Sequence, residues 1–113
     1  MYMIRLWTWR NIKHIRKHQV APREADEVVV TAQRPYPENL GNEKWAIHGQ
    51  TKSGRWLQVI FVYVPLEDVE PDEFAELRLD QRLALENGEE AFRVIHAREL
   101  TRDEKRRSRR RGQ

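Results

Sequence analysis

The spacing of apolar residues predicts a strand and two helices near the beginning of the chain. Over residues 1–7 apolar and polar positions alternate, which is typical of a short strand. Over residues 9–18 apolar positions recur at helical spacing and cations cover the remaining surface, as in an amphipathic helix. Pro22 suits the first position of a second helix. Residues 31–41 are rich in turn-forming residues and are predicted to be a loop.

The next segment predicts a hairpin that leads into the central strand. Residues 45–48 alternate as a strand, and residues 52–54 have the composition of a hairpin turn. Residues 55–64 form the most apolar run of the chain and are predicted to be the central strand. Pro65 is expected to end it.

The acidic segment over residues 67–87 has two interpretations. Pro71 and the acids after it are a favourable helix start, and Gly88 suits the position after a helix end. We therefore predict a helix. The leucines of this segment also alternate as in a strand, so a hairpin that turns at Asn87 and Gly88 is the alternative.

The last segment combines a strand with a basic helix. Residues 92–98 are rich in strand formers, and Thr101 with Glu104 forms a capping box that starts a helix. The resulting order, β-α-α-β-β-(α)-β-α, predicts an α+β fold with a small, mostly antiparallel sheet and helices packed on it. Residues 1–104 are expected to form one domain. Residues 105–113 are a basic C-terminal tail, of a composition that is often disordered.

Charge is unevenly distributed, although the net charge of the 113 residues is only +3. Residues 1–20 carry lysines and arginines with no acid, residues 67–90 are strongly acidic, and the residues from Arg98 onward are again basic. Basic ends around an acidic middle favour a nucleic-acid-facing surface plus a separate element. The absence of cysteine excludes disulfides, thiol nucleophiles and Cys-zinc sites. No apolar run reaches the length of a membrane span and no signal peptide is recognisable, so a cytoplasmic protein is expected.

The strand over residues 92–98 carries the candidate chemistry. A strand that carries Arg, His and Arg and runs straight into a basic helix is one way to hold several cations against a polyanion. His96 and Arg98 share one face of a regular strand, and Arg93 then lies on the opposite face with Ile95 and Ala97. His96 and Arg98 are therefore the natural pair for proton transfer and phosphate binding. In the alternative, His96 is a surface histidine and Arg98 pairs with a carboxylate such as Glu99 or Glu104.

Two further groups of residues could bind nucleic acid or take part in catalysis, and each also has a purely structural explanation. Lys17 and His18 either cap the first helix through its last carbonyls or take part in catalysis or phosphate binding. His48 and Arg55 fit ordinary surface positions, and the basic tail fits either a solvated run or a non-specific polyanion contact. The candidates are, as catalytic residues, His96, Arg98, Lys17 and His18, and, as nucleic-acid-binding residues, Arg93, Arg55, Arg16, Lys13, Arg102 and Arg106.

Three motifs resemble one toxin family. Residues 11–20, with Lys-His near their end and an acidic helix after them, resemble the opening of BrnT-type toxins. Residues 47–55 are similar to the Ile-Gly-Arg-Thr…Gly-Arg hairpin of that family. Residues 93–98, Arg-Val-Ile-His-Ala-Arg, followed by Thr101 and Glu104, resemble its Arg-Ile-Ile-Ser-Ala-Arg…Thr…Glu ending.

The resemblance implies a fold related to RelE-like endoribonucleases and cleavage of mRNA without metal or cofactor. It also implies a cognate antitoxin that covers the toxic surface and binds operator DNA, and a toxin–antitoxin heterotetramer is one assembly compatible with this. Gln19 stands where the family has Gly, His96 where Ser is common, Thr8 where Asp usually follows Trp, and residues 65–91 replace a tight turn. The alternative function is a non-catalytic nucleic-acid- or protein-binding module on the same scaffold, with the acidic insertion in the groove.

Overall fold

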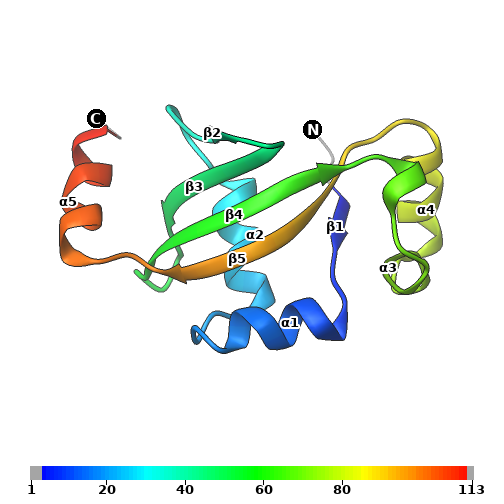
Figure 1. The fold of residues 1–113 in the computed structure, drawn as a ribbon, viewed down its shortest axis with the longest axis horizontal. Coiled ribbons are helices and arrows are strands. Elements are labelled where there is room, and N and C mark those ends of the chain that lie inside the picture. The colour runs from blue at the N-terminus through cyan, green and yellow to red at the C-terminus, as the bar shows by residue number, and fades with distance from the viewer. Residues whose placement is uncertain (1–3, 112–113) are drawn as a thin grey trace.

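A mixed sheet organises the computed structural model, which describes residues 4–111 (Figure 1). Within that range its five strands lie in the order β1-β5-β4-β3-β2. Only β1 is parallel to its neighbour, β5, and the other pairs are antiparallel. The α+β class and the mostly antiparallel sheet are therefore confirmed. The strands are β1 (Ile4–Leu6), β2 (Glu38–Gly41), β3 (Lys44–Gln50), β4 (Trp56–Val64) and β5 (Ala91–Glu99).

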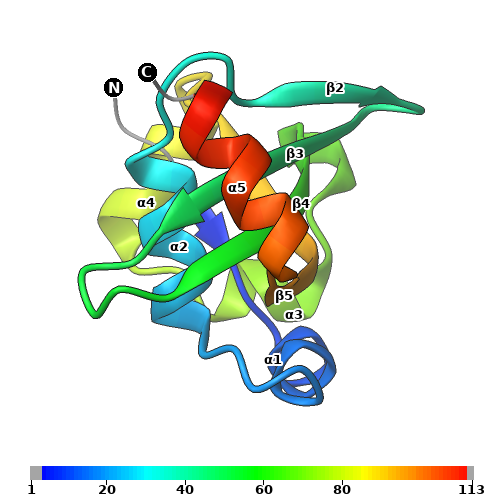
Figure 2. The same cartoon turned by 90° about the vertical axis from the view of Figure 1, so that its left-hand side faces the viewer.

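The helices leave one face of the sheet largely uncovered. Figure 1 shows α2 behind the sheet, α1 below it along β5, α5 at one end and α3 with α4 at the other. Figure 2, viewed from the end that carries α5, shows α5 crossing in front of β3 and β4, with α1 below them. The helices are α1 (Trp9–Arg16), α2 (Pro22–Val30), α3 (Pro71–Ala75), α4 (Leu79–Glu86) and α5 (Arg102–Arg111), with a 3-10 turn at Leu66–Asp68.

The main core lies between the sheet and α2. Alternate residues of β4, namely Leu57, Val59 and Phe61, are buried on this face, and Val28 of α2 packs against it. Burial of such apolar side chains contributes roughly 1.5–3 kcal/mol each. The alternation read from the sequence thus identifies the face of β4 that is buried.

The acidic segment forms a second core on the opposite face of the sheet. It folds as the 3-10 turn, α3 and α4 in place of the one helix or hairpin that we expected. Leu77 and Leu85 of this segment pack against Ile4 and Leu6 of β1 and Ala91 of β5. The leucines that alternate in sequence therefore belong to two short helical pieces, and packing against β1 decides their structure.

One other segment differs from the expectation, and the predicted basic helix extends through part of the expected tail. Residues 31–41 were predicted to be a loop, but they include β2, which pairs with β3 across the turn at Asn42 and Glu43. The basic segment after residue 104 continues α5 to Arg111, and Ser108 of this helix is buried against the sheet. The helix is thus attached to the domain through at least one side chain of the expected tail.

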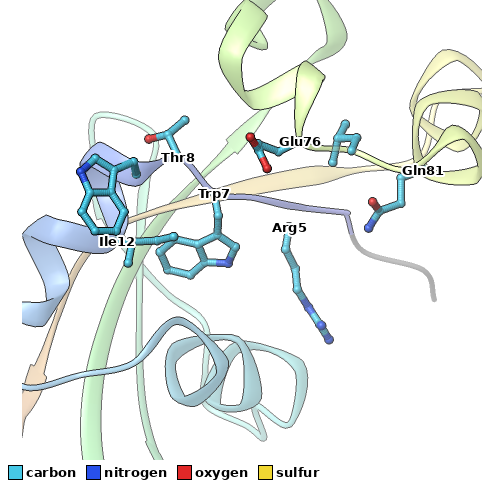
Figure 3. A pocket seen from close by; sticks show the side chains of 8 residues that line it. Arg5, Trp7, Thr8, Ile12, Glu76 and Gln81 are labelled. Carbon is cyan, nitrogen blue, oxygen red and sulfur yellow. The ribbon is translucent and has the colours of Figure 1, made fainter.

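Asp26 of α2 is a buried carboxylate that joins the helix to β1. It accepts hydrogen bonds from the Trp7 indole at 3.0 and 3.1 Å, and Arg5 lies 3.8 Å away. Figure 3 shows Trp7 and Arg5 extending from β1 and its continuation toward α2. Burial raises the pKa of Asp26 from 3.8 to about 6, and the Trp7 hydrogen bond and Arg5 oppose this rise.

Stability is expected to depend on pH through Asp26. Because the folded state binds this proton more tightly than the unfolded state, the free energy of unfolding should fall as pH rises from 4 to 6. The loss is at most about 3 kcal/mol, at 1.36 kcal/mol per pKa unit. Asp26→Asn keeps an acceptor for Trp7 and should remove this fall, whereas Trp7→Phe should steepen it. Urea unfolding between pH 4.5 and 7.5 measures both effects, and an unchanged slope in Asp26→Asn would refute this assignment.

Candidate functional site

The candidate site lies on the sheet face opposite α2. Residues that pair directly across neighbouring strands carry their side chains on the same side of the sheet. Arg98 of β5 pairs with Gln58 of β4, which pairs with His48 of β3. His96 pairs with Ile60 in the adjacent row. These polar side chains therefore form a patch on the open face between α5 and α3–α4 (Figure 1).

A β-bulge changes which residues of β5 share this face. His96 pairs with Ile60, but Val94 pairs with Phe61, so Ile95 is an extra residue in β5. Such an insertion returns the residues before it to the other side of the sheet. Arg93, opposite Val62, consequently lies on the same face as His96. The expectation that Arg93 points to the opposite face was wrong because it assumed a regular strand.

α1 brings two more histidines to His96. This helix lies along β5, where the Asn11 side-chain amide donates to the Val94 carbonyl at 3.4 Å. The ring centroid of His96 is 5.0 Å from that of His18 and 6.3 Å from that of His14. The His14 and His18 rings are 6.4 Å apart. Residues from α1 and from β5, which are far apart in the sequence, therefore meet in one three-histidine cluster.

The end of α1 sets the position of His18. After Lys17, which is the C-cap, Gln19 adopts a left-handed conformation with φ of 60°. The backbone N–H of Val20 donates to Ile15 at 3.3 Å, and both side chains are buried. This is a Schellman motif, which favours Gly at the left-handed position. Gln19, the residue at which this chain departs from the Gly of the BrnT-type motif, thus occupies a helix-ending position.

Burial and nearby cations shape the chemistry of His96. Partial burial lowers its pKa below the ordinary 6.5, and positive charge at His18, Arg98 and His14 lowers it further. A neutral imidazole at pH 7 can accept a proton. His14 and His18 are exposed at the end of α1, so they are accessible to a substrate that reaches His96.

Arg98 is held in place by the start of α5. Its guanidinium donates two hydrogen bonds of 2.8 Å to Glu104 and one to the Glu99 carbonyl. Glu104 also closes the predicted capping box with Thr101. The Arg98 hydrogen bonds and the Thr101 backbone N–H hold the pKa of Glu104 well below its usual range. A guanidinium has five N–H donors, so this pair leaves some of them for a phosphate.

The other candidate cations separate into paired and exposed ones. Arg93 donates two hydrogen bonds of 2.6 Å to buried Glu73 of α3. Arg55 donates to Glu24 at 2.8 Å and lies 3.5 Å from Glu99, so it joins α2 to the sheet. The exposed candidates lie on α1 and at its end, or on α5: Lys13, Arg16, Lys17, Arg102 and Arg106.

A cavity of about 490 Å³ lies apart from this patch, between β1, the start of α1 and α3–α4 (Figure 3). Its titratable lining residues are Arg5 and Glu76, and no histidine lines it. Arg5 is next to Asp26. Over residues 4–111 no group of three or more histidines, aspartates or glutamates has an arrangement suited to a metal ion. The three-histidine cluster is therefore the better centre for proton transfer.

Sequence reasoning missed His14 and Gln58. His14 and His18 are four residues apart, a spacing that places both on one helix face, and this was the available signal. Nothing in the sequence pointed to Gln58, because it belongs to the patch only through its pairing with Arg98 and His48 in the sheet.

Comparisons with known proteins found no counterpart. No protein-family model, curated protein or solved structure matches this chain. No helix in the described part of the chain has the length and apolar character needed to cross a membrane.

Proposed function

We propose that this protein is an endoribonuclease that cleaves RNA without a metal ion. The observation that carries the proposal is the cluster of His96, His18 and His14, whose ring centroids are 5.0–6.4 Å apart, on an open sheet face that also holds Arg98. Such a cluster supplies the base, the acid and the cation that the reaction needs.

In the proposed reaction His96 takes the proton of the 2′-OH. The 2′-oxygen then forms a bond to phosphorus, and the bond from phosphorus to the 5′-oxygen breaks. A protonated imidazole at His18 or His14 gives its proton to the leaving oxygen. Arg98, oriented by Glu104, stabilises the charge that builds on the phosphorane. The products are a 2′,3′-cyclic phosphate and a 5′-hydroxyl.

We propose further that this nuclease acts as the toxin of a type II toxin–antitoxin pair in the cytoplasm. The BrnT-like motifs over residues 11–20, 47–55 and 93–98 support this assignment. Two of these segments supply the histidine cluster and Arg98. The partners would be mRNA and a DNA-binding antitoxin, and an antitoxin that masks the open sheet face would neutralise the activity.

The test combines a cleavage assay with an expression assay. The purified protein should cut single-stranded RNA in EDTA and leave 2′,3′-cyclic phosphate ends. Induced expression in a bacterial host should stop growth. If the protein leaves RNA intact and expression at high level is harmless, the nuclease proposal fails.

The pH dependence of cleavage gives a separate prediction. As pH rises from the acidic side, kcat/KM should increase with a midpoint at the pKa of the base in the free enzyme. If His96 is that base, this midpoint should lie below pH 6.5. Arg98→Ala removes a positive charge that lowers the pKa of His96, so the midpoint should move to higher pH. Arg98→Lys keeps the charge and should leave it in place. A midpoint that stays fixed in Arg98→Ala would exclude His96 as the titrating base.

One observation favours a second function, a non-catalytic nucleic-acid- or protein-binding module. Arg93 and Arg98 are each bound by a glutamate through two hydrogen bonds, which partly neutralises the face. For this function, RNA binding without cleavage is the expected result. Salt-dependent binding that survives His96→Ala, from a wild-type protein that does not cut, would favour it.

A further inference from the structure

A cavity of about 530 Å³ adjoins the patch at the edge of β3. It lies between α5, β3 and the segment after α2, and Figure 2 shows α5 beside β3 at this end of the sheet. The cavity does not include His96 or Arg98, so it is distinct from the proposed catalytic centre. Its lining includes Gln33, Arg34, Tyr36, His48, Trp56 and Ser108.

Aromatic rings form part of the lining. The rings of Tyr36 and His48 lie 5.5 Å apart at an interplanar angle of 31°, and Trp56 lines the same cavity. Planar side chains of this kind are the platforms on which proteins stack unpaired bases, at roughly 1–3 kcal/mol per base. Every nucleobase has such a face, so the rings favour a base over an aliphatic ligand.

Polar groups fix the orientation of His48. Its Nδ1 is 2.8 Å from the Ser108 hydroxyl, and its Nε2 is 3.1 Å from the Gln58 side-chain amide nitrogen. Gln58 donates to Nε2, so the proton of a neutral ring is on Nδ1 and is donated to Ser108. These two contacts fix the position of the His48 ring. The Gln33 amide and the Arg34 guanidinium add hydrogen-bonding and cationic groups to the lining.

One row of paired residues on the open face of the sheet links the cavity to the catalytic patch. Gln58 pairs with His48 on one side and with Arg98 on the other. Directly opposite side chains in a sheet are about 5 Å apart at Cβ. A phosphate at Arg98 would therefore be within reach of a neighbouring nucleotide whose base enters the cavity.

We propose that this cavity binds the base of a nucleotide next to the cleaved bond and sets the sequence preference of the enzyme. The proposal rests on the proposed ribonuclease function for its role in cleavage. The binding of a nucleotide to the cavity can be measured without cleavage.

The experiment titrates the full-length protein with each of the four nucleoside 5′-monophosphates and follows tryptophan fluorescence. Binding should quench the signal of Trp56, and Trp56→Phe should remove that change. Tyr36→Leu keeps an apolar side chain but loses the ring, and it should weaken binding about fivefold or more. Tyr63→Leu is the matched control at the far end of β4 and should bind as the wild type does.

Cleavage mapping then separates this proposal from the nuclease proposal. Tyr36→Leu should still cut RNA, with a reduced base preference at one position next to the cut. If no monophosphate binds the wild-type protein, the cavity proposal is overturned even if RNA is cut. If the monophosphates bind and RNA stays intact, the nucleotide site stands and the nuclease proposal fails.

Discussion

Alanine in place of His96 should reduce RNA cleavage by about 10²- to 10⁴-fold, the usual contribution of a positioned general base. The neighbouring His18 ring, with its centroid 5.0 Å away, does not replace His96, because in the proposed reaction it serves as the acid. RNA binding should persist, since the cations of α1 and α5 are unchanged. Single-turnover cleavage and filter binding, measured on the same preparations, separate the two properties.

Two variants control for effects other than proton transfer. Lys44→Ala removes an exposed cation from β3 on the same sheet face, opposite Val62, and should change cleavage by no more than about twofold. Induced expression of His96→Ala should no longer arrest growth, whereas Lys44→Ala should. A His96→Ala protein that folds normally and cuts RNA at the wild-type rate would remove His96 from the mechanism.

Much of the sheet could be predicted because its burial pattern is local. The alternation of β4 and the strand formers of β5 identified both strands, and Trp9, Ile12 and Ile15 identified α1. The capping box at Thr101 placed the start of α5 correctly. In each of these elements the local spacing and the tertiary packing favour the same structure.

The candidate site was less predictable, because it depends on contacts between distant residues. A single extra residue, Ile95, places Arg93 on the face of His96, and no spacing rule indicates where a bulge occurs. The approach of His14 to His96 depends on α1 lying along β5 beyond β1. The alternative partner for Arg98, Glu104, was anticipated, and the structure shows this pair together with the histidine cluster.

The acidic segment of α3 and α4 illustrates the same distinction. Its composition indicated helix, but the sequence did not show that α3 would provide a buried partner for Arg93. Glu73 is only 2% exposed, and its carboxylate accepts from Arg93 at 2.6 Å on both oxygens. The Glu73 hydrogen bonds raise the pKa of Arg93. This acidic segment is therefore joined to the open face by one charged pair and by the second core around Leu77.

Removal of Arg93 should destabilise the protein by about 2–4 kcal/mol, because it leaves the buried Glu73 carboxylate without its cation. The lower end allows for the partial exposure of Arg93, which is 25% accessible. For a chain of this size the loss lowers Tm by roughly 10–20 °C. Urea unfolding of Arg93→Ala at pH 7.5 measures the loss directly.

The double replacement Arg93→Met with Glu73→Leu should recover most of this stability, since apolar residues of similar size often replace a buried pair without loss. Arg78→Ala is the exposed control: Arg78, just before α4, pairs with Asp80 at 3.2 Å on the surface, and its loss should cost far less stability than the loss of Arg93. If Arg93→Ala is as stable as Arg78→Ala, the charged pair does not hold the acidic segment. The packing of Leu77 and Leu85 against β1 must then be enough to keep α3 and α4 on the sheet.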